Sequence, residues 1–398
     1  MSFFTKLYKH IQKEGDEERP SKRARLTSEK SDKIDSDPLK FRRDNHEIYR
    51  YAAVPYSKPA HICDVSRNSK GVYSSDDSEM VKFVPPKKDC DLNQGFETWK
   101  HEELGRAELT FEPVMRAVAE KVQAGMPKPK VHFVTWRGNL TKLLCAPYGG
   151  RDDWEMSVYC KKGVIYMDAR ETPACQMRKQ TMDGKQRLWT YYGYKFEHYC
   201  TGVEDSVPVD TCPGANYNAV RRVGIGGLRL LICGEVDCYS GDPATENFME
   251  LKTSKLMTDE RSKNSFEKHK LMKFWAQSFT IGVPRVVVGF RDEKGIVKKL
   301  QRFYTLKIPQ LIAGRERELW DSKVCINFMH KLLIWIYETV SDTKEPWLLR
   351  YNGHDSSYIE LIPKVERKKH CVFDEKYYRF VEPYPKPKEV GKSGFTRK

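Results

Sequence analysis

Acidic side chains and one lysine occur at a two-residue spacing in two neighbouring apolar segments. Glu235 and Asp237 follow the first segment, and Glu250 and Lys252 lie in the second. Because alternate side chains of a strand point to the same face, each pair is expected to project together. Turn-forming residues at 242–244 would let the two strands pair. The pattern therefore predicts three carboxylates and a lysine on one face of a sheet.

A patch of three carboxylates favours a bound cation. Like charges at close range raise one another's pKa unless a cation neutralises them, and oxygen ligands of this kind suit Mg²⁺ or Mn²⁺. The order Asp237, spacer, Glu250-x-Lys252 resembles that of the PD-(D/E)xK nucleases, whose acids hold metal while the lysine lies beside the attacking water or the scissile phosphate. A lysine there can orient hydroxide or stabilise developing negative charge. The alternative is two exposed strand faces with chance spacing, because Glu and Lys are abundant in this chain.

A fourth carboxylate lies on a segment with helical spacing. Leu188, Tyr192 and Phe196 recur every four residues, which predicts an amphipathic helix. Gly193 and Glu197 are also four residues apart and share a face of that helix. The glycine is expected to allow close packing on the sheet, and the next turn presents Glu197. A helix with one exposed acid and a tolerated glycine is the alternative.

Two further segments could bind phosphate. Arg137 lies between Trp136 and Gly138, and a guanidinium binds phosphate oxygens through paired hydrogen bonds. Gln277 is the polar residue of the aromatic run 274–279, on an expected helix. Taken singly, a surface arginine at the end of a strand and a surface glutamine on an amphipathic helix explain these residues equally well.

Short strands alternate with amphipathic helices through most of the chain. Hairpins are predicted over 154–166 and 285–297, and helices near 111–124, 186–200, 265–280 and 322–341. No segment rich in Gly, Pro or Ser divides this region. We therefore expect a mixed α/β fold, with curved mixed sheets flanked by helices in one domain.

The domain is expected to span residues 46–380, between a disordered basic tail at 1–45 and a flexible tail at 381–398. In the first tail, the basic cluster Pro20–Leu26 resembles a nuclear localisation signal and predicts a nuclear protein, with some of it in the cytoplasm. A solvated run of charges is the alternative reading of this cluster.

The composition limits the classes of function. The chain has 398 residues, a formal charge of +15 and 12% aromatic residues, which suits a folded protein with a polyanionic partner. No apolar run reaches the roughly 18 residues of a membrane span, and the N-terminus lacks a secretory signal, so a soluble intracellular protein without a membrane partner is expected. Eleven cysteines without CxxC spacing argue against a zinc site and against a disulfide framework.

Taken together, the segments WRG, GYKFE, EVD, ELK and WAQSF occur in an order and approximate spacing similar to the DXO-type decapping exoribonucleases, whose core is PD-(D/E)xK nuclease-like. The match covers roughly residues 50–345. The resemblance implies that the metal ligands are Glu197, Glu235, Asp237, Glu250 and the main-chain carbonyl of Leu251. It implies that Lys252 acts in catalysis together with Glu235, Asp237 and Glu250.

The same resemblance implies a set of substrate contacts: Trp136, Arg137, Gly138, Asn218, Glu235, Lys252 and Gln277. Asn218 departs from the residue type of the family, which puts that contact in doubt. Arg67, Glu103 and Glu108 are candidates for further contacts, but the local match is too loose to assign them.

The activity implied by the resemblance is hydrolysis at RNA 5′ ends with two divalent ions, Mg²⁺ or Mn²⁺. The enzyme would release intact NAD caps or unmethylated caps and pyrophosphate from 5′-triphosphate RNA, and would degrade RNA from 5′ to 3′. Two alternatives belong to other classes: a partner that stabilises a nuclear 5′→3′ exoribonuclease, and a DNA endonuclease of the same broad fold. The presence of every motif acid favours catalysis, and the WRG and GYKFE segments favour RNA.

Overall fold

The computed structural model describes most of the chain. The described ranges are residues 37–50, 54–99, 110–149, 152–202, 209, 215–241, 247–314, 318–353, 356–365 and 373–387. The basic cluster Pro20–Leu26 lies outside them, so the predicted nuclear localisation signal stays a prediction.

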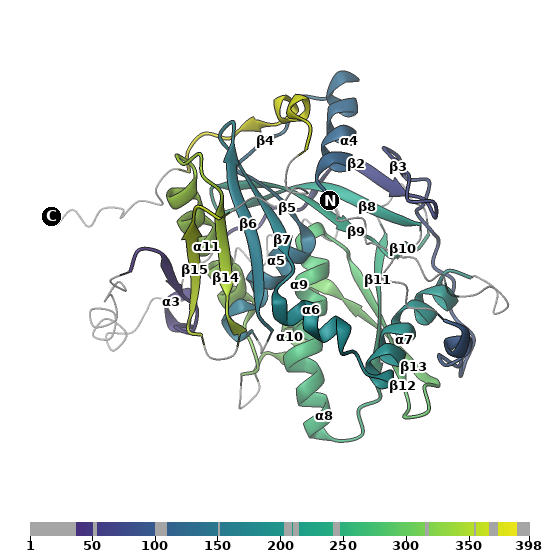
Figure 1. Ribbon diagram of the computed structural model, residues 1–398. Coiled ribbons are helices and arrows are strands. Elements are labelled where there is room, and N and C mark those ends of the chain that lie inside the picture. Colours follow the sequence, from purple (N-terminus) through teal and green to yellow (C-terminus); the bar gives the residue numbers. More distant parts are fainter. Residues whose placement is uncertain are drawn as a thin grey trace.

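A ten-stranded mixed sheet forms the larger layer of the molecule (Figure 1). Its strands run in the order β1-β15-β14-β6-β7-β5-β9-β8-β2-β3. In this sheet β5 is parallel to both β7 and β9, whereas the other pairs are antiparallel. The strands are β1 (Lys40–Arg42), β2 (Ala60–Arg67), β3 (Tyr73–Ser74), β5 (Phe133–Trp136), β6 (Trp154–Lys161), β7 (Val164–Arg170), β8 (Asn216–Ile225), β9 (Leu228–Glu235), β14 (Trp347–Tyr351) and β15 (Tyr358–Pro363).

Helices cover both faces of the large sheet, because its central strands are apolar on both sides. In β9, Leu230 and Ile232 pack in one core cluster while Leu231 packs in another. Helices α5 (Arg137–Cys145), α9 (Met272–Ile281) and α11 (Ser322–Val340) bury their apolar stripes in the first cluster, and α4 (Glu112–Gln123) packs on the opposite face. The two-residue alternation of strands thus builds two hydrophobic layers.

A smaller mixed sheet carries the second half of the motif region. It has the strand order β10-β11-β12-β13, and β11 and β12 are parallel. Helix α7 (Gly184–Cys200) covers it, with Tyr192 and Phe196 packed against Leu251. The strands are β10 (Cys238–Tyr239), β11 (Phe248–Lys255), β12 (Arg285–Arg291) and β13 (Val297–Tyr304).

Shorter elements complete the described part of the fold. They are α3 (Glu47–Arg50), α6 (Pro173–Gln180), α8 (Glu260–Ser265), α10 (Ile308–Ile312), η1 (Phe96–Thr98), η2 (Ala146–Tyr148), η4 (Phe266–Leu271), η5 (Thr305–Lys307), η8 (Glu375–Phe380), β4 (Lys130–Val131) and β16 (Glu382–Pro383). The last two strands form a small parallel sheet.

The predicted fold class is confirmed, and so are the principal elements. The hairpins predicted over 154–166 and 285–297 are β6–β7 and β12–β13. The four predicted helices correspond to α4, α7, the η4–α9 pair and α11. In the η4–α9 pair, a π-helical turn runs directly into the α-helix.

One predicted pairing is wrong. The strands that carry Glu235 and Glu250 do not pair, because β9 belongs to the large sheet and β11 to the small one. The chain leaves β9 at Glu235 and enters the small sheet at Cys238, which pairs with Met249. Asp237 therefore lies at the crossing between the two sheets, where both contribute side chains to one place.

Two predicted domain boundaries are also corrected. Strand β1 lies inside the segment 1–45 that was expected to be disordered, because Phe41 packs against Phe328 and Trp335 with ring centroids 5.6 and 5.4 Å apart. Strand β16 lies inside the segment 381–398 that was expected to be flexible, because it pairs with β4. Strand pairing and, at Phe41, aromatic packing thus include these short segments in the fold.

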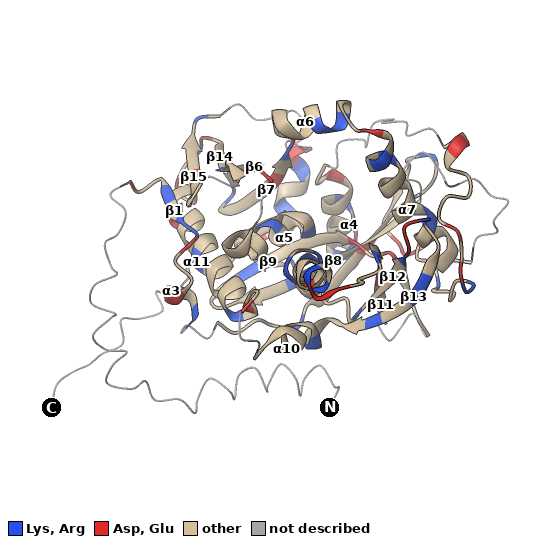
Figure 2. Cartoon of the chain, turned by 90° about the horizontal axis from the view of Figure 1, so that it is seen from below, with Lys and Arg blue, Asp and Glu red and all other residues tan. Residues whose placement is uncertain are grey.

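Basic side chains and cysteines are both spread over the described part of the fold. Figure 2 shows Lys and Arg distributed over many elements, including α6. The cysteines in the described ranges are free thiols, and most of them are buried. Among the described helices, none combines the length and the apolar character that a bilayer crossing requires.

Candidate active site

Glu250 is the centre of the site. Its side chain is fully buried on β11 and accepts hydrogen bonds from three other side chains. Arg137 Nη1 donates to Oε2 over 2.7 Å, while Lys252 Nζ and Gln277 Nε2 each donate to Oε1 over 2.5 Å. Burial opposes the charge on Glu250, but Arg137 and Lys252 outweigh that effect and lower its pKa. Glu250 is therefore held as a carboxylate.

Asp237 lies next to this centre and accepts a backbone hydrogen bond. Leu251 N donates to Asp237 Oδ2 over 2.6 Å, and Lys252 Nζ lies 3.6 Å from the same oxygen. Burial and the neighbouring charge of Glu250 raise the pKa of Asp237 to about 7. This side chain is therefore a carboxylate whose charge is poorly compensated by the protein alone.

Lys252 lies between the acids. Besides its bond to Glu250, its ammonium donates to the carbonyl oxygen of Leu251 over 2.9 Å. Burial opposes its charge, but Glu250, Asp237 and Glu197 together raise its pKa. The lysine is therefore a fixed cation and not a proton acceptor at neutral pH.

Glu197 reaches the site from α7. Burial raises its pKa well above the ordinary value, and the nearby charges of Asp237 and Glu235 raise it further. The predicted burial of Tyr192 and Phe196 on this helix is confirmed. The prediction that Gly193 allows the helix to pack closely on the sheet is wrong. A Cβ added to Gly193 would meet no atom within 4 Å, so this glycine does not pack on the sheet.

The close approach of α7 to the sheet occurs at Gly289 of β12 instead. A Cβ added there would lie 2.5 Å from Cε2 of Phe196, which is fully buried next to Glu197. Such a distance is too short for two carbons, so glycine is required for this packing. The strand sequence Val287-Val288-Gly289 carries the signal, since a glycine in a buried strand often marks a close approach.

Arg137 is the first residue of α5, directly after β5 ends at Trp136. It passes over Gly234 of β9, where an added Cβ would lie 2.6 Å from Arg137 Cβ. Arg137 is buried against the large sheet and reaches Glu250 of the small sheet. Gly234 therefore leaves room for Arg137, a role that the sequence motif did not predict.

The neighbours of Arg137 differ in what they contact. The indole of Trp136 donates to Asp168 Oδ1 over 2.9 Å and stacks on Phe111, with 5.0 Å between ring centroids. Its side chain therefore fixes the end of β5. Gly138 has open space where a side chain would project, so its backbone is approachable.

Asn218 and Glu235 are directly opposite each other on β8 and β9. Asn218 Nδ2 donates to Asn216 Oδ1 over 3.2 Å, and Glu235 is exposed at the end of its strand. Arg67 lies on the adjacent strand β2, opposite Asn216, while Glu103 and Glu108 fall outside the described ranges. The structure thus gathers Asn218 with the acids, near the place where β9 ends.

The donor set fits a divalent cation. Glu197, Asp237, Glu235 and Glu250 interact electrostatically, and burial with mutual repulsion raises the pKa of Glu197 and Asp237. An oxygen-rich, over-negative cluster of this kind is what Mg²⁺ or Mn²⁺ neutralises. In the described part of the chain, no three acidic, histidine or cysteine side chains converge as direct ligands in this conformation. Since Arg137, Lys252 and Gln277 take the oxygens of Glu250, a cation there requires Glu250 to exchange a partner.

Comparison with known proteins identifies the family. The family described as RAI1-like PD-(D/E)XK nuclease matches residues 57–378, most of the chain. The decapping and exoribonuclease protein of Xenopus laevis is 33% identical over 323 residues, which cover 74% of this chain and 79% of that protein.

Solved structures agree in fold. S. pombe Rai1 in complex with 3′-FADP is 27% identical, has a TM-score of 0.66, and covers 82% of this chain and 99% of its own. Candida albicans Rai1 in complex with pU5 and Mn²⁺ is 24% identical, has a TM-score of 0.68, and covers 77% of this chain and 90% of its own. This chain therefore belongs to the RAI1-like PD-(D/E)XK nuclease family, and it is a hydrolase that acts on RNA.

Proposed function

We propose that the protein removes intact 5′ groups from RNA by hydrolysing the first phosphodiester, and that it then degrades 5′-monophosphate RNA from 5′ to 3′. The observation that carries this proposal is the buried cluster in which Arg137, Lys252 and Gln277 converge on Glu250, with Asp237 and Glu197 beside it. Cations and an amide donor at one carboxylate-rich point suit a phosphate diester and its attacking water.

Each protein group has a role in this proposal. Glu197, Glu235, Asp237, Glu250 and the Leu251 carbonyl would hold two divalent ions, Mg²⁺ or Mn²⁺, which would supply an activated hydroxide and neutralise the leaving oxygen. Lys252 stays protonated and stabilises negative charge on the phosphate in the transition state.

The 5′ side of the substrate is held by the other predicted contacts. Arg137 and Gln277 bind phosphate oxygens, and the backbone at Trp136 and Gly138 lies along the substrate, since Gly138 leaves open space there. Asn218 contacts the nucleotide next to Glu235, which it faces across β8 and β9. All of these side chains lie within the region matched by the family.

The proposed substrates are RNAs with an NAD cap, an unmethylated cap, a 5′-triphosphate or a 5′-monophosphate. From a triphosphate end the enzyme would break a different bond: water would attack the α-phosphate and split the α–β phosphoanhydride, releasing pyrophosphate and leaving a 5′-monophosphate RNA. Support comes from the relatives, which include a protein named for decapping and exoribonuclease activity and structures in complex with 3′-FADP and with pU5. A nuclear location is also proposed, from the basic cluster Pro20–Leu26.

The test is a paired substitution at the acids. Glu235→Ala with Asp237→Ala is expected to abolish release of every 5′ group and the subsequent degradation, by at least a thousandfold. A matched control is Glu260→Ala with Glu293→Ala, which removes two exposed acids outside the site and leaves the rates unchanged. Retained cleavage by the first variant, when its melting curve shows a folded protein, would contradict the proposal.

The partner role predicted as an alternative is compatible with catalysis but has no observation in its favour among the described residues. A pull-down from nuclear extract that recovers a large 5′→3′ exoribonuclease in equal amount would support it. The DNA endonuclease alternative predicts cutting of circular single strands, whereas an enzyme that starts at a 5′ end leaves circles intact.

A further inference from the structure

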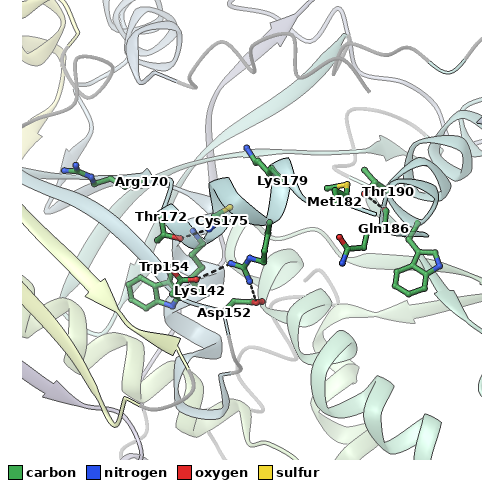
Figure 3. Close-up of a pocket in the computed structure, with 13 residues that line it drawn as sticks. Lys142, Asp152, Trp154, Arg170, Thr172, Cys175, Lys179, Met182, Gln186 and Thr190 are labelled. Carbon is green, nitrogen blue, oxygen red and sulfur yellow. Dashed lines mark hydrogen bonds and ion pairs between the residues drawn. The ribbon is translucent and has the colours of Figure 1, made fainter. Parts of the chain in front are cut away.

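A cavity of about 600 Å³ lies between α6, the start of α7 and the end of α5 (Figure 3). Four cations line it, Lys142, Arg170, Arg178 and Lys179, together with two carboxylates. The indole of Trp189 is 56% exposed at its rim. A basic excess beside an exposed aromatic ring is the combination that binds single-stranded nucleic acid.

Much of the charge in this cavity is paired within the protein, since Lys179 Nζ lies 2.6 Å from Glu171 Oε1. Arg178 pairs with Asp152 and Asp153 over 2.8 and 3.2 Å. Lys142 is half-buried and forms no hydrogen bond or ion pair with another described residue. Burial lowers the pKa of Lys142, and the nearby charge of Asp153 offsets this effect only in part. An anionic ligand would therefore gain a contact that the protein leaves open.

Helix α7 connects this cavity with the catalytic cluster. Gln186 and Thr190 line the cavity, and Gly193 and Glu197 follow on the same helix face. From Thr190 to Glu197 the helix rises about 10 Å. Between them, the face at Gly193 opens into free space, since an added Cβ meets no atom within 4 Å.

Helices α5 and α9 also connect the cavity with the catalytic cluster. On α9, Lys273 lies 3.7 Å from Asp152 of the cavity, and one turn later Gln277 binds Glu250. On α5, Lys142 of the cavity lies one turn after Gly138, which also has open space in place of a side chain. Three helices thus each carry one residue at the cavity and one at the catalytic site, and on α5 and α7 the glycines Gly138 and Gly193 leave open space along the way.

We propose that this cavity binds the body of the RNA, taking the second or third nucleotide on the 3′ side of the scissile phosphate. Trp189 stacks on the base, and Lys142 contacts a backbone phosphate. This inference rests on the proposed function, since it extends the substrate of the same site. The exposed rim at Trp189 suits a continuing strand, because the body of a polymer must leave to solvent whereas a terminal 5′ group need not.

The experiment measures how binding depends on RNA length. Fluorescence anisotropy with 5′-monophosphorylated, 3′-labelled RNAs of two to eight nucleotides, with Ca²⁺ replacing Mg²⁺ to slow cleavage, gives the Kd of the wild-type protein, Trp189→Ala and Lys142→Met. Tyr304→Ala is the matched control, since Tyr304 is 55% exposed on β13 and does not line the cavity. The wild-type Kd is expected to fall as the RNA becomes long enough to reach the cavity.

Loss of one base–aromatic stack should weaken binding of the longer RNAs by Trp189→Ala about tenfold, with a smaller change for the dinucleotide. Equal Kd values for wild type and both variants at every length would overturn the proposal. So would ultraviolet crosslinking of Trp189 only to a 5-iodouridine placed on the 5′ side of the cleaved bond.

Hydrolysis of the dinucleotide in Mg²⁺ is measured in parallel and tests the proposed function by itself. Cleavage by the wild type without a length-dependent gain in affinity would remove the cavity assignment and leave the proposed function standing. Length-dependent binding that Trp189→Ala abolishes, without cleavage of any RNA, would remove the proposed function and leave the RNA contact.

Discussion

Glu250 binds Arg137, Lys252 and Gln277, which lie on α5, β11 and α9 respectively. The sequence named all four as candidates: strand spacing placed Glu250 and Lys252 on one face, and the family resemblance added Arg137 and Gln277 as substrate contacts. It did not predict that Glu250 is fully buried and joins the others, since burial depends on how the two sheets meet. Nor did it predict the glycines at 234 and 289, whose use lies in contacts with residues distant in sequence.

At the residue scale, Asp237→Asn removes the negative charge of this side chain while keeping its size. The pKa of Asp237 is raised to about 7 in the folded protein, so above that pH its charge costs stability that the amide does not. In EDTA at pH 8 the variant should be more stable than wild type by roughly 1–3 kcal/mol, while its activity is lost. Urea unfolding measures this difference in stability.

Added Mg²⁺ or Mn²⁺ is expected to raise the melting temperature of the wild type and to raise that of Asp237→Asn much less, because the amide binds the cation more weakly. Equal metal-dependent shifts for the two proteins would contradict the assignment of Asp237 as a ligand.

Gly234→Ala tests the close approach of Arg137 to β9. The added Cβ would lie 2.6 Å from Arg137 Cβ, so the guanidinium must move away from Glu250. A displacement of this size is expected to reduce kcat/KM about a hundredfold. Gly227→Ala in the β8–β9 turn is the control, because its Cβ makes only one ordinary contact. Similar kinetics for the two variants would show that the position of Arg137 does not matter.

At the element scale, the helices and hairpins were predictable because each has a strong local period. The helix α7 shows the limit of that approach. Its register, and hence the face that carries Glu197, followed from Tyr192 and Phe196, but its contact with the sheet was assigned to Gly193 when Gly289 of β12 provides it. Helical periodicity identifies the buried face of a helix, but it does not identify the strand residue opposite.

Gly289→Ala should separate α7 from β12. The new Cβ would lie 2.5 Å from the buried ring of Phe196, and overpacking of this kind costs about 1–3 kcal/mol of unfolding free energy. The same shift moves Glu197, so activity should fall as well. Adding Phe196→Leu makes room, and the double variant is expected to lose less stability than the sum of the single variants. Additive losses in urea unfolding would argue against this contact.

At the scale of the whole molecule, the site forms where two sheets meet, and this is the part that local pattern could not predict. A hairpin through residues 242–244 was the simplest way to join Asp237 to Glu250, but the chain changes sheets after Glu235 instead. The alternation pattern is the same in both arrangements. Only the long-range pairing of β5 with β7 and β9 and of β11 with β12 distinguishes them.

The C-terminal segment is joined to the large sheet through His132, which gives the fold a pH dependence. Arg229 N donates to His132 Nδ1, and His132 Nε2 donates to the carbonyl of Pro385. This arrangement needs a neutral ring, and burial lowers the pKa of His132. Below about pH 6.5 the unfolded chain binds a proton that the folded protein does not, so stability falls as the pH falls.

His132→Asn is therefore expected to lose stability less steeply than wild type between pH 7.5 and pH 5.5 in urea unfolding. A slope for His132→Asn as steep as that of wild type would show that this ring does not carry the effect.

The central claim is that the buried carboxylate cluster cleaves RNA at its 5′ end. The most direct measurement is digestion of 5′-labelled RNAs carrying NAD, unmethylated cap, triphosphate or monophosphate ends, in Mg²⁺ or Mn²⁺ and in EDTA, with products identified by mass. The predicted result is metal-dependent release of an intact 5′ group, or of pyrophosphate from the triphosphate end, followed by shortening from 5′ to 3′. No release from any of these ends by the folded protein, or equal cleavage of circular RNA, would contradict the claim.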